Sequence, residues 1–171
     1  HGNLEALRAV VADARAKSFD RAVSVGDVVG YGADPSACLD LLRELGAGIV
    51  LGNHDQAVLG TLPPEGFNEY ARSAVEWTAA KLSAAEMTFL GTFPYVIREE
   101  GYAVSHGTLH LPEEYRYLLT EAEAEASLKV LDRPVCFLGH THLPVWARAA
   151  AKGEGLEISV NEPAPVDPGR P

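Results

Sequence analysis

Metal-ligand side chains gather in four short runs of this chain. The runs are residues 26–30 (GDVVG), 52–55 (GNHD), 105–107 (SHG) and 139–142 (GHTH). They combine carboxylate, amide and imidazole groups, and imidazole suits Mn, Fe, Ni and Zn. A carboxylate oxygen can bridge two cations, and two cations about 3.5 to 4 Å apart can hold a hydroxide for in-line attack on phosphorus. The runs therefore predict a two-metal hydrolytic site.

Each of these runs follows an apolar segment that is typical of a strand. The segments are residues 21–25, 48–51, 102–104 and 134–138. Their residue types favour buried strands. Ligands of layered α/β proteins gather at the carboxyl ends of the strands, so we expect the four runs to meet in one crevice.

Helices separate the first strands. Asn3 is predicted to cap a helix that has Leu4 and Val10 on its apolar face. Asp34 is predicted to cap a second helix, which has Pro35 at its first position. A strand, a crossover helix and a second strand form a parallel βαβ unit, which the spacing allows. The predicted fold class is α/β.

The predicted secondary structure changes after residue 56, from alternating strands and helices to helices alone. Residues 56–91 read as helices, and Ser83 with Glu86 forms a capping-box pattern. Strand candidates at 95–98 and 102–105 flank a turn at 99–101, which predicts a hairpin and more antiparallel sheet in the second half.

Composition narrows the class of protein. A chain of 171 residues with 47% hydrophobic and 22% charged residues is typical of one globular unit. Its net charge is -10 and it has no Lys/Arg cluster, which argues against a duplex nucleic-acid partner. There is no apolar run of membrane-spanning length and no secretory pattern, so we expect a cytoplasmic protein without a membrane partner. Cys38 and Cys136 are expected to be small buried hydrophobes rather than a disulfide.

The ordered set of motifs resembles the calcineurin-like metallophosphoesterases, in particular their small bacterial and archaeal phosphodiesterase-like branch. The set is residues 1–3 (HGN), 26–27 (GD), 52–55 (GNHD), 105–107 (SHG) and 139–142 (GHTH). The resemblance implies a four-layer αββα-type β-sandwich flanked by helices, with residues 1–171 as a single metallophosphoesterase domain.

The resemblance also implies a role for each site residue. Asp27 would bridge two divalent metal ions, with Mn favoured and Fe, Ni or Zn as alternatives. His1 and His142 would bind the first ion. The second ion would be bound by Asn53, His106 and His140. A hydroxide bridging the ions would attack the phosphorus.

Two residues are expected to meet the substrate beside these ligands. His54 would contact the phosphate, together with Asn53, and help to protonate the leaving group. Tyr31 is expected at the entrance of the site, with a packing role as an equal alternative.

Several of these polar residues also have simpler interpretations. His140 and His142 are two residues apart, which on an extended segment places both on one face and favours ligation. His106 alone is evenly balanced between a core histidine and a ligand. His110 fits no motif position and is interpreted as a loop histidine, and Asp55 is expected to hold its loop or begin the next helix.

The chain departs from the family pattern at both ends. The first family motif has an Asp two residues before its His, whereas this chain begins at His1. We therefore expect that an N-terminal strand with this Asp, and a C-terminal strand hinted at by residues 167–169 (DPG), are missing from the chain. The other interpretation of His1 is a residue left from a purification tag.

The sequence thus predicts a cytoplasmic metal-dependent phosphoesterase that acts on a small phosphodiester or nucleotide-like substrate. Alternatives within the enzyme class are a phosphomonoesterase, a protein phosphatase and a dinucleoside polyphosphate hydrolase. The alternative from another class is a non-catalytic binding scaffold with a degraded metal site. Homo-oligomerisation is left open.

Overall fold

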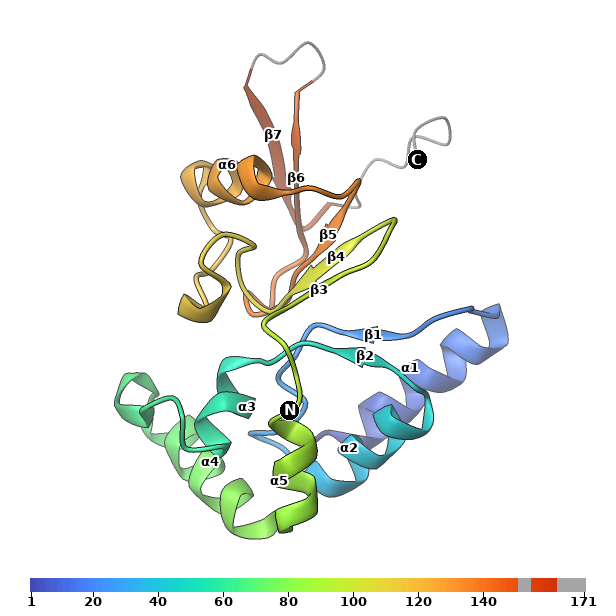
Figure 1. Cartoon of the computed structure of the whole chain (residues 1–171), viewed down its shortest axis with the longest axis vertical. Helices are drawn as coiled ribbons and strands as arrows, with labels where there is room; N and C mark the ends of the chain where they lie inside the picture. Colours follow the sequence, from blue (N-terminus) through green and yellow to red (C-terminus); the bar gives the residue numbers. More distant parts are fainter. Residues whose placement is uncertain (151–154, 163–171) are drawn as a thin grey trace. The chain divides into compact units, whose positions relative to one another are not determined.

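The computed structural model of the chain describes residues 1–150 and 155–162 (Figure 1). The chain divides into two compact units, His1–Tyr95 and Val96–Pro171. They are described separately as unit 1 and unit 2.

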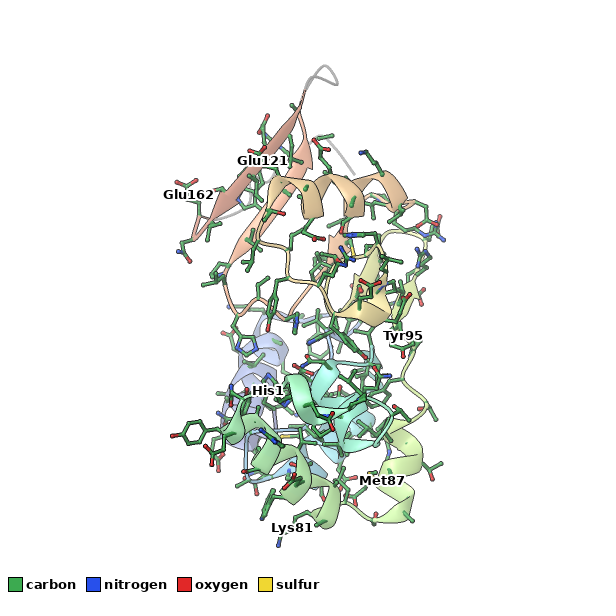
Figure 2. The ribbon with its side chains drawn as sticks, turned by 90° about the vertical axis from the view of Figure 1, so that its left-hand side faces the viewer. His1, Lys81, Met87, Tyr95, Glu121 and Glu162 are labelled. Carbon is green, nitrogen blue, oxygen red and sulfur yellow. The ribbon has the colours of Figure 1, made fainter. Side chains whose placement is uncertain are left out.

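Unit 1 contains one parallel strand pair and several helices. The strands β1 (Val23–Ser24) and β2 (Gly48–Ile49) pair in parallel, and α2 (Pro35–Glu44) connects them. The predicted βαβ unit is therefore confirmed, although each paired strand is shorter than its apolar segment. The other elements are α1 (Leu4–Lys17), α3 (Asn53–Val58), η1 (Pro64–Gly66), α4 (Glu69–Lys81) and α5 (Ala84–Leu90). Figure 2 shows Lys81 at the end of α4 and Met87 on α5.

Local capping explains where these helices begin. The Asn3 side chain accepts the N–H of Ala6 at 3.0 Å, as expected for a cap. Ser83 and Glu86 form the predicted capping box at the start of α5. Asp34 occupies the cap position of α2, but its side chain makes no capping hydrogen bond there.

The core of unit 1 gathers apolar residues from its helices, its strands and the loops after the strands. Leu39, Leu90 and Val29 are completely buried in it. Val10 was expected on the buried face of α1, and this prediction is wrong because the side chain is 64% exposed. Helix α1 therefore contributes to this core through Leu4 and not through Val10.

The described residues of unit 2 form two small sheets and one α-helix. The predicted hairpin is confirmed, because β3 (Val96–Arg98) and β4 (Ala103–Ser105) pair antiparallel. The strand β5 (Cys136–Phe137) pairs in parallel with β4. After η2 (Pro112–Glu114), the helix α6 (Glu121–Val130) packs against an antiparallel pair formed by β6 (Val145–Ala149) and β7 (Leu156–Val160).

Strand position decides burial in the three-stranded sheet. The central strand β4 is fully buried, as the sequence predicts. The edge strand β5 is not, and Phe137 is 48% exposed, so the expectation of a buried strand is wrong there. An edge strand has a neighbour on one side only, and this leaves one side of its residues open.

The described residues mix helices and sheets, which confirms the predicted α/β class. None of the described helices is long and apolar enough to cross a membrane. Both cysteines are free thiols, and Cys38 is buried as expected, whereas Cys136 is only half-buried. Burial raises the pKa of the Cys136 thiol to about 11, which keeps it protonated near neutral pH.

Candidate metal centre

The first group of predicted site residues lies in unit 1. We call His1, Asp27, Tyr31, Asn53 and His54 the first half-site. Asp27 follows β1, and Asn53 and His54 begin α3 after β2. The backbone N–H of His54 donates to Asp27 Oδ1 at 2.9 Å, so the loops after the two parallel strands are joined at the carboxylate.

Glycine at position 52 makes this junction possible. A Cβ at Gly52 would lie 2.1 Å from Asp27 Oδ1 and 2.3 Å from the Asp27 backbone nitrogen. Real side chains do not approach so closely, because the contact is far inside the van der Waals separation. The absence of a side chain at Gly52 therefore leaves the space that Asp27 occupies.

The Asp55 carboxylate also joins these two loops, through hydrogen bonds to the backbone of each. It is fully buried and accepts the N–H of Val29 at 3.1 Å and the N–H of Gly52 at 3.0 Å. Each oxygen thus satisfies a backbone donor that would otherwise be buried without a partner. This confirms the prediction that Asp55 holds its loop.

His1 is held against the loop after β1 by backbone hydrogen bonds. Gly2 donates to the carbonyl of Val28 at 2.8 Å, and Gly32 donates to the carbonyl of His1 at 2.6 Å. As a result, His1 Nε2 lies 3.4 Å from Asp27 Oδ2.

Aromatic rings surround His54. Its ring centroid lies 4.7 Å from His1, 4.6 Å from Tyr31 and 4.9 Å from Phe67. Tyr31 is 49% exposed, so it packs on the histidines with one side and meets solvent with the other. Phe67 is not among the predicted site residues, because its place just after η1 carries no spacing signal.

The second group lies in unit 2. We call His106, Tyr115, Tyr117, His140 and His142 the second half-site. His106 directly follows β4 and is buried, and Gly139 donates its N–H to the His106 carbonyl at 2.9 Å. This backbone contact brings the GHTH run to the end of β4, and His106 Nε2 lies 3.1 Å from His140 Nδ1.

The backbone of the GHTH run differs from the expectation. His140 has φ 64° and His142 has φ 54°, both in the left-handed region. The prediction that both lie on one face of an extended segment is therefore wrong. The run bends instead, with a hydrogen bond from Thr141 N–H to the Gly139 carbonyl at 2.7 Å.

Two tyrosines that the sequence analysis did not single out pack on these histidines. Tyr117 stacks on the His140 ring at 4.0 Å with 12° between the planes. Tyr115 meets the His106 ring edge-on at 5.7 Å. Only the proximity of residues 115–117 to the SHG run in the sequence could have pointed to them.

The ligand atoms of each half-site have the spacing of ligands that share one ion. Metal ions bind histidine nitrogen and carboxylate oxygen at about 2.0–2.2 Å, so two ligands at angles of about 90–110° lie roughly 3.0–3.5 Å apart. The separation is 3.4 Å between His1 Nε2 and Asp27 Oδ2, and 3.1 Å between His106 Nε2 and His140 Nδ1. The residues present therefore fit divalent cations.

Comparison with known proteins relates the whole set of motifs to one family. The family model of calcineurin-like phosphoesterases matches residues 1–144, which include every predicted site residue. An uncharacterized protein of Methanocaldococcus jannaschii is 36% identical over 148 residues, covering 84% of this chain and 60% of the relative.

Solved structures are similar as well. A metallophosphoesterase from Sphaerobacter thermophilus has a TM-score of 0.73 and 38% identity, covering 87% of this chain and 60% of that one. A candidate diadenosine tetraphosphatase has a TM-score of 0.50 and 32% identity over 64% of this chain and 47% of that one. A hypothetical protein from Pyrococcus horikoshii shares the fold, with a TM-score of 0.64 at 15% identity over 93% of this chain and 83% of that one.

The chain spans 60% of the length of both the archaeal relative and the Sphaerobacter structure. The family match over residues 1–144 nevertheless covers most of the 171 residues. The mixture of helices and sheets is that of the α/β metallophosphoesterase fold. The chain therefore belongs to the calcineurin-like phosphoesterase family.

Proposed function

We propose that this chain is part of a metal-dependent phosphoesterase that hydrolyses a phosphodiester or a nucleotide-like substrate. The observation that carries the proposal is the pair of ligand atoms in each half-site, 3.4 Å apart in one and 3.1 Å apart in the other. Membership of the calcineurin-like phosphoesterase family supports it.

In this proposal both half-sites bind the same two divalent cations. Asp27 would bridge the ions, and His1 and His142 would bind the first one. Asn53, His106 and His140 would bind the second one. Mn is the expected metal, because these oxygen and nitrogen ligands suit it, although Fe, Ni and Zn accept the same ligands.

The cations, when bound, would lower the pKa of a water molecule and offset charge on the phosphoryl oxygens. The protein residues would position and protonate the substrate. His54 is held by ring contacts with His1, Tyr31 and Phe67, which fix the orientation of its imidazole. An imidazole fixed in this way can contact the phosphate and donate a proton to the leaving oxygen.

The exposed ring of Tyr31 and one similar structure support the proposed substrate class. Tyr31 contacts both His1 and His54 and leaves about half of its surface to solvent, at 49% exposure. An exposed aromatic ring beside a phosphate site can pack on a nucleoside base. One similar structure is described as a candidate diadenosine tetraphosphatase, which supports a nucleotide-like substrate. A single domain, a cytoplasmic location and a small-molecule partner belong to the same proposal.

Hydrolysis of bis-p-nitrophenyl phosphate with added Mn²⁺ tests this function. The chain is assayed as it stands and with an Asp placed two residues before His1, as the family motif has it. His54→Ala should abolish most turnover, whereas Asp40→Asn, on the exposed face of α2, should not change it. Parallel assays with diadenosine tetraphosphate, p-nitrophenyl phosphate and a phosphopeptide separate the enzyme classes. Bound metal without turnover on any of these esters would contradict the proposal and support a binding scaffold.

A further inference from the structure

The loop of residues 107–120, between β4 and α6, carries the two tyrosines of the second half-site. Tyr115 meets the ring of His106, and Tyr117 stacks flat on the ring of His140. Tyr117 is 50% exposed, so the protein core does not fix its ring from all sides. Buried residues such as Leu109 and Leu118 anchor parts of the loop, and polar contacts hold the exposed part that carries Tyr117.

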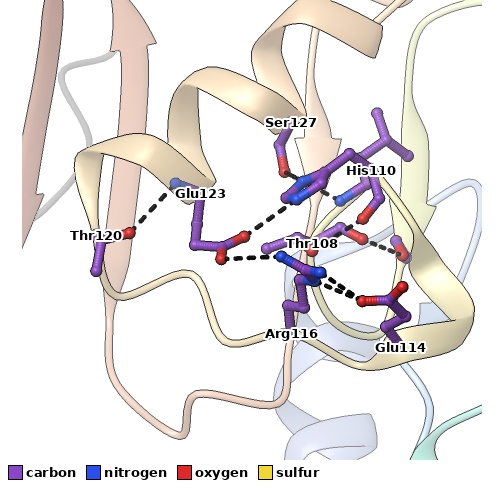
Figure 3. A network of polar contacts seen from close by, with 9 residues as sticks. Thr108, His110, Glu114, Arg116, Thr120, Glu123 and Ser127 are labelled. Atoms are coloured by element: carbon purple, nitrogen blue, oxygen red, sulfur yellow. Dashed lines mark hydrogen bonds and ion pairs between the residues drawn. The ribbon is translucent and has the colours of Figure 1, made fainter.

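A polar network joins the loop to α6 (Figure 3). His110 Nε2 lies 3.1 Å from Glu123 Oε2, and Arg116 Nη1 lies 3.6 Å from the other oxygen, Glu123 Oε1. Glu123 therefore contacts the loop at two points six residues apart in the sequence. Arg116 is also paired with Glu114 at 2.6 Å, within the loop itself.

Ser127 completes the attachment one helical turn after Glu123. Its hydroxyl accepts the N–H of Leu109 at 3.1 Å and lies 3.3 Å from His110 Nδ1. Positions four apart on a helix share a face, so Glu123 and Ser127 present one polar surface of α6 to the loop. Glu123, His110 and Ser127 are arranged like the acid, base and nucleophile of a catalytic triad. Ser127, however, is only 8% exposed, and its hydroxyl accepts the N–H of Leu109. The arrangement therefore holds the loop rather than attacking a substrate.

The contact between His110 and Glu123 is better shielded from water than an ordinary surface pair. The side chains are 15% and 25% exposed. On the same helix, Glu125 and Lys129 are 56% and 76% exposed. Exposed pairs contribute little, because water screens them and the long side chains lose freedom.

The backbone of the loop needs such support. Leu111 has φ 48° and Tyr115 has φ 51°, in the left-handed region that bulky residues disfavour. Backbone strain of this kind persists only where surrounding contacts fix it. Thr108 N–H donates to the Arg116 carbonyl at 3.0 Å, so the position of Arg116 also sets where the tyrosines on either side of it lie.

We propose that Glu123, through His110 and Arg116, is a positioning residue for the second half-site. It holds the loop so that Tyr115 and Tyr117 fix the orientation of the His106 and His140 imidazoles, and thereby sets the affinity of the half-site for a cation. This inference rests on the proposed function in that the two histidines bind a divalent cation.

The test is a Co²⁺ titration of the whole chain, followed by the visible absorption bands of the bound ion and by the melting temperature. Glu123→Gln keeps the size of the side chain and removes its charge. The matched control is Glu125→Gln, two residues further on the same helix and more exposed. Loss of a group that hydrogen-bonds a metal ligand typically costs 10–100-fold in affinity. Glu123 acts one step further away, through the loop, so we expect a loss of up to about 10-fold for Glu123→Gln with altered absorption bands. The control should match the parent chain.

Further variants sharpen the test, and His110→Gln keeps it decisive if Glu123→Gln does not fold. His110→Gln should reproduce the loss of Co²⁺ affinity. Tyr117→Phe, which keeps the stacked ring, should retain the affinity that Tyr117→Ala loses. Glu123→Gln combined with Tyr117→Ala should lose less than the two single losses multiplied, because both act on the same ring.

The outcomes separate this inference from the proposed function. Unchanged bands and affinity in Glu123→Gln overturn the inference, also when the melting temperature falls, because the residue then acts on stability alone. An equal effect of Glu125→Gln, or no Co²⁺ binding by the parent chain, overturns it too. Co²⁺ binding that responds to Glu123→Gln in a chain without turnover supports the inference and contradicts the proposed function.

Discussion

The two half-sites present similar ligands but are held by different kinds of contact. In the first half-site, backbone groups and one buried carboxylate do most of the positioning, through Asp55, Gly52 and the N–H of His54. In the second half-site, side-chain contacts dominate, with stacked tyrosines and the network around Glu123.

This difference indicates how each half-site can fail. Backbone positioning in a buried region couples the first half-site to the stability of unit 1, because a lost hydrogen bond leaves a buried donor unsatisfied. Ring contacts couple the second half-site to the loop of residues 107–120, so a local change in this loop reaches the two histidines. Changes in the residues that position the first half-site should therefore destabilise the protein, whereas changes in those that position the second should weaken metal binding.

The largest expected effect comes from Asp27→Asn, which removes the charged oxygen that both cations are proposed to share. Cations supply several kcal/mol of transition-state stabilisation, so hydrolysis of bis-p-nitrophenyl phosphate should fall by roughly 1000-fold or more. Asp40→Asn, an exposed residue of α2, is the control for loss of a negative charge. Turnover within a few-fold of the parent chain would contradict the proposal that Asp27 is a metal ligand.

Asp55→Ala should cause the largest loss of stability. It leaves the N–H groups of Val29 and Gly52 buried without their acceptor, and each such group costs about 1–3 kcal/mol. Urea unfolding should therefore show a loss of about 2–6 kcal/mol. A loss below about 1 kcal/mol would mean that the backbone of the first half-site does not depend on this carboxylate.

Gly52→Ala tests the close approach at Asp27 by adding one methyl group. The new Cβ would meet Asp27 Oδ1 at 2.1 Å, so the loops must separate at a cost of about 1–3 kcal/mol in unfolding free energy. Gly66→Ala is the matched control, because a Cβ there meets nothing within 4 Å. Equal unfolding midpoints for the two variants would contradict a steric clash between a Cβ at position 52 and Asp27.

Tyr117→Ala should separate metal binding from stability. Removing the ring that stacks on His140 is expected to lower Co²⁺ affinity about 10-fold. The melting temperature should change little, because Tyr117 is 50% exposed. A large fall in the melting temperature with unchanged affinity would show that the second half-site is held in the same way as the first.

The smallest effect concerns Glu86, far from either half-site in the sequence. Hydrogen bonds from Ser36 and from Ser83 lower the pKa of Glu86 below its usual value of 4.5. A lowered folded pKa stabilises the protein above the unfolded pKa, and the contribution is lost as the pH falls through the folded pKa. The stability difference between the parent chain and Glu86→Gln, at most about 1 kcal/mol, should be full near pH 6 and vanish on acidification through the region below pH 4.5. A difference that grows toward acid would contradict this assignment.

The sequence was most informative where contacts are local. The Asn3 cap and the Ser83 and Glu86 box join residues three apart, and both are confirmed. The parallel unit β1–α2–β2 and the hairpin β3–β4 follow from apolar runs and turns between neighbours in the chain. The sequence was less informative for burial, as Val10 and Phe137 show, because burial depends on what packs against a residue.

By itself, the sequence determined the ligand types, their order and the family, because these depend on residue identity and spacing alone. The tertiary structure decided the conformation around them: the left-handed His140 and His142, the ring of Phe67 on His54 and the attachment of His110 to Glu123. Each of these depends on contacts between residues that folding brings together from separate elements. An aromatic or charged residue has the same appearance in the sequence whether it packs on a ligand or faces solvent, so no local pattern marks these contacts.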